Sequence, residues 1–178
     1  MKRKIELWDY AGKILEGIGK GALLTVRADG KVNTMTVGWG TLGIEWGKPI
    51  CTVFVRESRY TKELLDRNPE FTLNIPMDEA CREILKVCGT RSGRDMDKFA
   101  ELGLTEEAPE VISVPGIRQL PLTLECRVIY RQEQVISEMN REARERYYPV
   151  SEQFPRGDVH TAYYGQVLSA YIIDGENS

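Results

Sequence analysis

Short hydrophobic runs that alternate with polar residues recur along the chain, and this period of two predicts β-strands. The clearest pair is Ala22 to Arg27 and Val32 to Val37, which residues 28–31 join through an Asp-Gly turn typical of a tight hairpin. Further strands are expected at ICTVFV after Lys48-Pro49, at residues 70–75, at residues 122–136 as one long strand or a bent pair, and at residues 159–173.

Helical periodicity is confined to shorter stretches between these strands. Helices are expected at residues 5–20, from Ser58 as N-cap to Asn68, at residues 78–88 with Gly89 as C-cap, at about residues 95–102, and at residues 138–148. The glycines between residues 38 and 47 are of the kind found at bulges and barrel corners. The pattern favours a mainly β protein with peripheral helices, a small antiparallel barrel, over a doubly wound parallel sheet.

The length of 178 residues suits one domain, residues 1–178, with a sizeable core. Hydrophobic residues make up 42% and charged residues 29%, and no apolar run approaches the roughly 20 residues that span a bilayer. The N-terminal MKRKIELWDY has no apolar stretch after its basic start, so it does not resemble a secretory signal. A cytoplasmic location without a membrane partner is expected.

Charge and cysteine usage argue against two further classes. A formal net charge of -3 argues against a nucleic-acid partner, because such affinity comes from many Lys and Arg side chains on phosphates. The four cysteines form no C-x-x-C pair, and His160 is the single histidine of the sequence. No metal site is therefore expected.

Arg56, Ser58, Arg59, Tyr60 and Thr61 stand where a predicted strand leads into a predicted helix. A phosphate needs a cation, hydroxyl donors and free backbone N–H groups in one place, and such a junction supplies them. In the alternative interpretation, Ser58 only caps the helix and the arginines are solvated. The residues alone leave both interpretations open.

Asn33, Thr34, Met35 and Thr36 lie on a predicted strand, so one pair can face a planar ligand while the other pair packs inward. In the alternative interpretation, Met35 fills the core and the hydroxyls are ordinary strand residues. Trp39 is likewise either a packing residue or a lid over a ring.

The segment from Asn33 to Thr61 contains Asn-Thr-Met-Thr, then Gly-Trp-Gly, then Val-Arg-Glu-Ser-Arg-Tyr-Thr. In these motifs it resembles the flavin reductase-like, FMN-binding split-barrel family, which includes the flavoredoxins. The resemblance also covers Ser92-Gly93 and Lys98-Phe99, and it extends over about residues 18 to 173. It implies an antiparallel split β-barrel that binds FMN, and a homodimer in which the loop with Ser92-Gly93 approaches the flavin.

The residues that this resemblance assigns to the cofactor lie in two segments and in the last strand. They are Asn33, Thr34, Met35, Thr36, Trp39, Val55, Arg56, Ser58, Arg59, Tyr60, Thr61, Ser92, Gly93, Lys98 and Tyr164.

The resemblance implies an NAD(P)H-dependent flavin or ferric reductase, with NADH or NADPH as a transient reductant. No G-x-G-x-x-G motif follows a strand, so a nicotinamide has no dinucleotide fold of its own here. A flavoredoxin-like carrier reduced by a redox protein partner is the first alternative. A dimeric flavin-binding or interaction protein without turnover is the second.

His160 stands where the family often has a histidine, although the family's following Gly-Glu-Val is Gly165-Gln166-Val167 here. His160 is the candidate catalytic residue of the nicotinamide pocket, and a surface position is the open alternative. Tyr163 and Tyr164 follow it, and alternation sends them to opposite faces, so only one of them can stack in the site.

Overall fold

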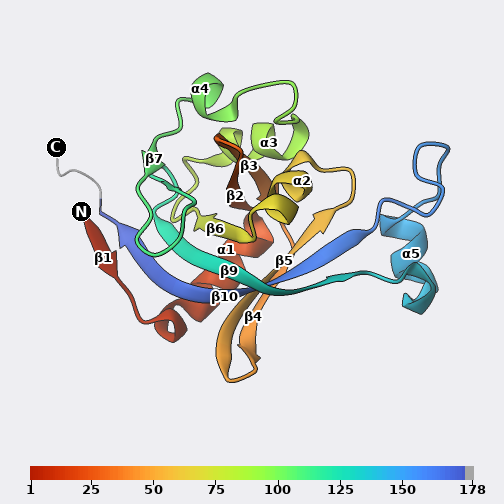
Figure 1. Ribbon diagram of the computed structural model, residues 1–178, viewed down its shortest axis with the longest axis horizontal. Coiled ribbons are helices and arrows are strands. Elements are labelled where there is room, and N and C mark those ends of the chain that lie inside the picture. The colour runs from red at the N-terminus through yellow and green to blue at the C-terminus, as the bar shows by residue number, and fades with distance from the viewer. Residues whose placement is uncertain (175–178) are drawn as a thin grey trace.

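The computed structural model describes residues 1–174 and shows one large antiparallel sheet with helices around it (Figure 1). The sheet follows the order β3-β2-β6-β9-β10-β5-β4, and β1 pairs with β10. Its strands are β1 (Lys2–Lys4), β2 (Ala22–Ala28), β3 (Lys31–Val37), β4 (Gly40–Glu45), β5 (Lys48–Arg56), β6 (Glu70–Ile75), β9 (Leu122–Glu133) and β10 (His160–Ile173). The prediction of a mainly β fold is confirmed.

Two 3-10 helices, five α-helices and a separate strand pair complete the elements of residues 1–174. They are η1 (Leu7–Tyr10), α1 (Ala11–Lys20), α2 (Tyr60–Arg67), α3 (Arg82–Thr90), α4 (Lys98–Leu102), β7 (Glu106–Glu107), β8 (Gly116–Ile117), η2 (Ile136–Glu138) and α5 (Arg141–Tyr147). None of the helices in this part of the chain has the length and apolar character that a membrane span requires.

The predicted hairpin of β2 and β3 is confirmed, with Val26 opposite Asn33 and Ala28 opposite Lys31. The run after residue 122 is one long strand rather than two, and its register against β10 shifts between Tyr164 and Gly165. Gly165 permits close packing there, because a Cβ at this position would lie 2.5 Å from the Phe71 ring.

Three predicted helix boundaries are wrong. The α-helix expected from residue 5 begins at Ala11, because the backbone N–H of Ile5 donates to Ala170 of β10 and residues 7–10 form the 3-10 helix η1. Arg59 rather than Ser58 occupies the N-cap position of α2. Gly89 lies inside α3, whose C-cap is Arg91, and the absence of a side chain at Gly89 instead lets Thr36 pack against it.

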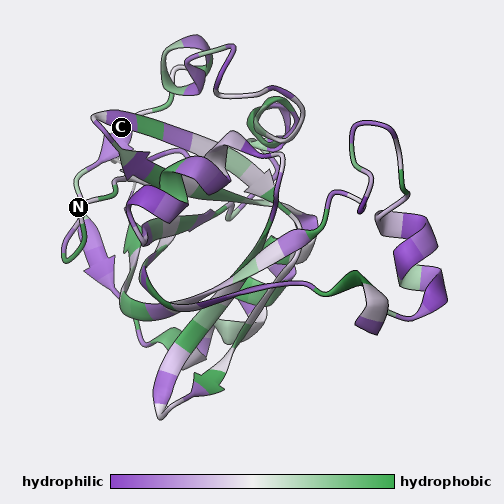
Figure 2. Cartoon of the chain, turned by 45° about the vertical axis from the view of Figure 1, so that its right-hand side comes forward, coloured by the Kyte–Doolittle hydropathy of each residue, from purple (hydrophilic) through white to green (hydrophobic). Residues whose placement is uncertain are grey.

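Alternating side chains of the sheet and the inner faces of α1 and α2 form the main core. Leu24, Val53, Leu73 and Leu124 are fully buried there, and Ile14 of α1 joins them. Figure 2 shows hydrophobic residues gathered on the strands of this body, whereas α5 is mostly hydrophilic. Burial of this apolar surface is the main source of stability.

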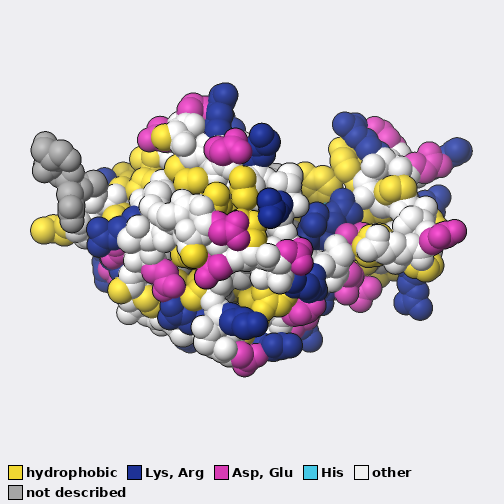
Figure 3. All heavy atoms as spheres, turned by 90° about the horizontal axis from the view of Figure 1, so that it is seen from above, with side chains coloured by type: hydrophobic (Ala, Val, Ile, Leu, Met, Phe, Trp, Pro, Cys, Tyr) yellow, Lys and Arg dark blue, Asp and Glu magenta, His cyan; other side chains and the backbone are white. Residues whose placement is uncertain are grey.

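Between β9 and β10 the chain leaves the body and forms a projecting arm, which we define as residues 134–159 with η2 and α5 (Figures 1 and 3). Arg56 at the end of β5 fastens this arm. Its guanidinium donates to the backbone oxygens of Asp158 at 2.7 Å and Tyr147 at 3.1 Å. The arm is thereby held beside the junction of β5 and α2.

Candidate functional site

Two adjoining cavities lie over β3 and the junction of β5 and α2, and we call them together the long groove. The first has a volume of about 370 Å³ and the second about 190 Å³. Met35, Arg59 and Gly89 line both of them, so the two spaces are continuous along this surface.

The first cavity is the basic end of the long groove. Arg59 and Arg91 line it with exposed side chains, and neither guanidinium has a hydrogen-bond or ion-pair partner within residues 1–174. No side chain caps the first turn of α2 at this end. Free cations beside an uncapped helix N-terminus favour an anionic group such as a phosphate.

Arg94 also lines the basic end, but its charge is already engaged. It donates to the backbone oxygen of Ser58 at 3.2 Å, pairs with Glu63, and lies over the Tyr60 ring. This leaves Arg59 and Arg91 as the guanidinium groups available to a ligand.

Ser58 lines the same cavity, yet both of its donors are taken by the arm. Its backbone N–H donates to Asp158 Oδ1 at 3.1 Å, and its hydroxyl donates to Oδ2 at 2.6 Å. Asp158 therefore occupies, with an anionic group of the chain itself, the donors that the sequence assigned to a phosphate.

Strand β3 supplies one wall of the groove. Because its side chains alternate between two faces, the four predicted residues do not all face the groove. Asn33 and Met35 line the groove, and Asn33 donates to the hydroxyl of Thr61 at 2.9 Å. Thr34 is fully buried and bonds to Thr25 inside the sheet. Thr36 lines the smaller cavity and donates to the Leu85 backbone oxygen at 2.5 Å.

Lys98 is a buried cation beneath this wall. Its exposed fraction is 4%, and Nζ donates to the backbone oxygens of Thr34 at 2.8 Å and Cys88 at 3.1 Å. Burial, with a smaller contribution from Arg59, lowers the pKa of its ammonium group. No carboxylate lies within ion-pair distance of Lys98 in the described chain, so the two carbonyls compensate its charge only in part.

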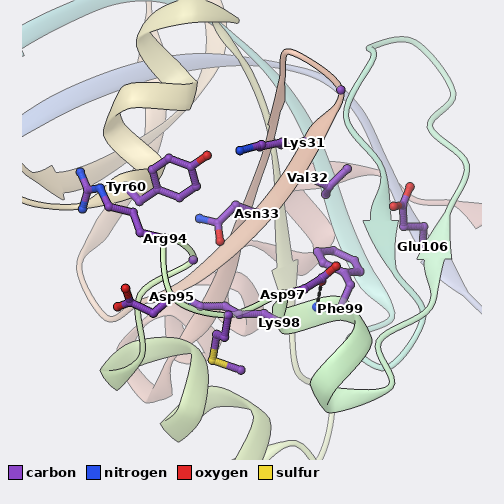
Figure 4. Close-up of a pocket in the computed structure, with 13 residues that line it drawn as sticks. Lys31, Val32, Asn33, Tyr60, Arg94, Asp95, Asp97, Lys98, Phe99 and Glu106 are labelled. Atoms are coloured by element: carbon purple, nitrogen blue, oxygen red, sulfur yellow. Dashed lines mark hydrogen bonds between the residues drawn. The ribbon is translucent and has the colours of Figure 1, made fainter.

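Lys98 also lines a third cavity of about 540 Å³, shown in Figure 4. In this view Asn33 lies at the centre, with Tyr60 and Arg94 to one side. Gly93 lines both this cavity and the long groove. Because a Cβ at Gly93 would lie 2.0 Å from Asn33 Oδ1, a larger residue would displace Asn33.

The second cavity is the aromatic end of the long groove. The rings of Trp39 and His160 lie 5.0 Å apart, and Trp39 also contacts Tyr147 edge-on. Phe54 and Arg56 line the same cavity. This end offers planar contact surfaces suited to a flat ring.

His160 is buried, with an exposed fraction of 7%. Desolvation, and then the nearby Arg56, lowers its pKa to about 4, so the imidazole is neutral at pH 7. Nδ1 lies 2.8 Å from the Tyr148 hydroxyl, which itself donates to Gln134 Oε1 at 2.8 Å. Because that hydroxyl gives its proton to Gln134, it accepts the Nδ1–H, and Nε2 is left as an acceptor.

The structure does not bring four residues of the sequence analysis to the groove, and the buried Thr34 is one of them. Val55 is fully buried in the core. Tyr163 is also buried and donates to Asp66 at 2.6 Å, while Tyr164 packs against Tyr130 with ring centres 5.2 Å apart. Alternation along β10 was expected correctly, but neither face of the strand at these tyrosines borders the long groove.

Several lining residues escaped the sequence analysis. Arg91 precedes the predicted Ser92-Gly93 pair but was not itself singled out, Gly89 was expected only as a cap, and the arm residues Asp158, Phe154 and Gln153 carried no signal. The arm residues reach the groove only because the arm folds back onto Arg56, which lies 102 residues from Asp158 in the sequence. Within residues 1–174 no group of His, Cys, Asp and Glu is arranged to hold a metal.

The model of the flavin reductase like domain family matches residues 20–178 of this chain. The chain belongs to this family. An uncharacterized protein of Archaeoglobus fulgidus is 32% identical over 106 residues, which are 60% of this chain and 59% of that protein. The uncharacterized protein YddH of Escherichia coli K12 is 32% identical over 98 residues, or 54% and 51% of the two chains. The matches thus span about half the length of these curated relatives or a little more.

Solved structures of flavin reductase-like proteins share the fold. The flavoredoxin of Methanosarcina acetivorans is 25% identical with a TM-score of 0.64, covering 86% of this chain and 68% of that one. An FMN-binding domain of a flavin reductases-like enzyme from Shewanella baltica is 18% identical with a TM-score of 0.69, covering 97% and 77%. The antiparallel split barrel is confirmed, and its sheet is not closed.

The long groove fits the flavin that family membership implies. One end holds two unpaired guanidinium groups, and the other holds Trp39, Phe54 and a neutral His160. A flavin mononucleotide has a dianionic phosphate at one end and a planar ring at the other. The charged donors at one end and the flat aromatic surfaces at the other therefore match the phosphate and the ring of the cofactor.

Proposed function

We propose that the long groove binds FMN, with the phosphate at the basic end and the ring at the aromatic end. The contrast between the two ends carries this proposal. Arg59 and Arg91 provide charge-assisted donors, and the first turn of α2 adds backbone N–H groups of the same polarity. Met35 lines both ends and forms the wall that orients the ring, Asn33 continues this wall toward the basic end, and Trp39 covers the edge of the ring.

We propose an oxidoreductase of the NAD(P)H-dependent flavin or ferric reductase type. Bound FMN supplies the hydride and electron chemistry, and the chain supplies binding and orientation. The neutral His160 has its Nε2 lone pair free to accept an N–H from the carboxamide of a nicotinamide. The aromatic end lacks carboxylates among its lining residues, which keeps the approach of an anionic dinucleotide free of repulsion.

A flavoredoxin-like electron carrier is the second candidate. The 25% identity to the flavoredoxin of Methanosarcina acetivorans favours it. In that case a reduced redox protein, rather than a nicotinamide, delivers the electrons. A flavin-binding or interaction protein without turnover is the third candidate, and a flavin reduced by neither donor would favour it.

We further propose a homodimer that works in the cytoplasm. Ile44, Trp46 and Tyr130 expose 72%, 58% and 43% of their surfaces near the β4–β5 turn, and the rings of Trp46 and Tyr130 are in contact. Such a cluster is typical of an interface. All four cysteines are buried free thiols, in keeping with a reducing compartment. Sedimentation during dilution tests the dimer, since flavin content should fall as monomers form.

An anaerobic absorbance titration tests the proposed function. The purified protein is first titrated with FMN, and stoichiometric, saturable binding is expected. NADH and then NADPH are added, and bleaching of the flavin band by either supports the reductase. Bleaching by dithionite alone favours the carrier, and the absence of FMN binding refutes the proposal as a whole.

A further inference from the structure

A second groove adjoins the aromatic end of the long groove, and we call it the side groove. Its volume is about 400 Å³, and it shares Gly38, Trp39 and Phe54 with the long groove. None of the residues that line it carries a formal charge. The long groove, in contrast, is lined by several arginines. A neutral ligand is therefore favoured in the side groove, and phosphates are not.

The walls of the side groove are apolar and partly exposed. Leu15 exposes 44% of its surface and Trp39 41%, and both line the side groove together with Ile18 and Phe54. Exposed apolar side chains gathered around a hollow are typical of ligand sites. A flat ligand that covers these side chains removes their apolar surface from water, which favours binding.

Two glycines keep the side groove open. A Cβ built at Gly19 or Gly38 meets no atom within 4 Å, so each glycine borders free space. Gly19 lies on α1, where glycine is a poor helix former and its presence has no local advantage. Because Gly19 lines the side groove, a larger side chain at this position would project into it.

One polar pair lines the otherwise apolar groove. Tyr148 donates its hydroxyl proton to Gln134 Oε1 at 2.8 Å and accepts from His160. The side-chain amide nitrogen of Gln134 has no hydrogen-bond partner in the described part of the chain. It remains a donor, and a carbonyl oxygen is the matching acceptor.

We propose that the side groove binds a neutral aromatic carbonyl compound of the quinone class. The ring contacts Leu15, Trp39 and Phe54, and the carbonyl oxygen accepts from Gln134. This binding does not need the flavin. The further role of the compound as an electron acceptor rests on the proposed function, because only a reduced flavin in the long groove would supply the electrons.

Isothermal titration of the full-length protein with 2-methyl-1,4-naphthoquinone tests this proposal, with the protein as purified and again after saturation with FMN. Gly19→Leu fills the groove, and about tenfold weaker binding or more is expected. Gly12→Leu is the matched control, because Gly12 lies on the same helix, also has open space at its Cβ, and does not line the groove. Neither change weakens the helix, because leucine is the better helix former.

Two further titrations test the proposed hydrogen bond from Gln134 and the preference for a neutral ligand. Gln134→Leu should weaken quinone binding about threefold to tenfold, the value of one hydrogen bond. The anionic 1,4-naphthoquinone-2-sulfonate should bind the parent protein much more weakly than the neutral quinone. The proposal is overturned if the parent binds no quinone, if Gly19→Leu binds as the control does, or if the sulfonate binds equally well. FMN binding is measured on each variant, so failure of the quinone site is distinguished from failure of the flavin site.

Discussion

The Asp158 carboxylate and Ser58 form a two-point hydrogen bond across 100 residues of sequence, at 3.1 Å from the backbone N–H and 2.6 Å from the hydroxyl. Asp158 thus places a negative charge at the basic end of the long groove. A phosphate that binds there meets Arg59 and Arg91 as attractive charges and Asp158 as a repulsive one. The affinity for FMN depends on the balance of these charges.

Asp158→Asn should therefore raise the affinity for FMN and leave that for riboflavin unchanged, because riboflavin lacks the phosphate. The expected gain is about 1 kcal/mol, the Coulomb energy of a close pair of charges in water, or about fivefold in Kd. Titration of both flavins measures it. An equal change for both flavins would mean that the arm moves, and an unchanged FMN affinity would place the phosphate elsewhere.

Arg59→Ala should weaken FMN binding by about 1.5–3 kcal/mol, the value of a hydrogen bond to a charged group. Stability should change little, because the guanidinium has no partner within residues 1–174. Arg67→Ala is the matched control on the same helix, since Arg67 pairs with Asp29 away from the groove. Fluorescence titration and urea unfolding measure the two effects, and equal flavin affinity of both variants would reject the phosphate assignment.

His160 should make the protein less stable in mild acid. Its pKa is about 4 in the folded protein against 6.5 for the free side chain, so between these values the unfolded chain binds the proton more readily. Stability from this group is complete above pH 6.5 and falls as pH decreases toward 4, by at most about 3 kcal/mol. His160→Gln should flatten the pH dependence of unfolding in this range. An identical pH profile would show that another group governs it.

Mutations of the neighbouring Tyr163 and Tyr164 should have different effects, because one side chain is bonded in the core and the other packs outside the long groove. Tyr163→Phe removes a buried hydrogen bond to Asp66 and should cost about 1–3 kcal/mol of stability, because it leaves the carboxylate with fewer donors. Tyr164→Ala should leave FMN affinity unchanged, because the ring packs on Tyr130 outside the long groove. Thermal unfolding and flavin titration separate the two, and a loss of flavin affinity in Tyr164→Ala would contradict this placement.

The local pattern of the chain determined most of the elements and part of the site. Alternation and the Asp-Gly turn predicted the hairpin of β2 and β3, because strand periodicity and turn chemistry are properties of neighbouring residues. The same alternation placed Asn33 and Met35 on one face of β3. The motifs from Asn33 to Thr61 predicted the family and the strand-to-helix junction, although the N-cap is Arg59 rather than the expected Ser58.

Only the tertiary structure decided which donors of that junction remain free. Ser58 and Arg56 look equivalent to Arg59 in the sequence, but the arm engages both of them through Asp158 and Tyr147. It also decided that Ile5 pairs with Ala170 of β10 and that residues 7–10 form a 3-10 helix, in place of the first turns of the expected α-helix. The reason is physical: hydrogen bonds and burial between segments about 100 residues apart have no signature in local periodicity, so the sequence indicates which groups can bind and the fold decides which are available.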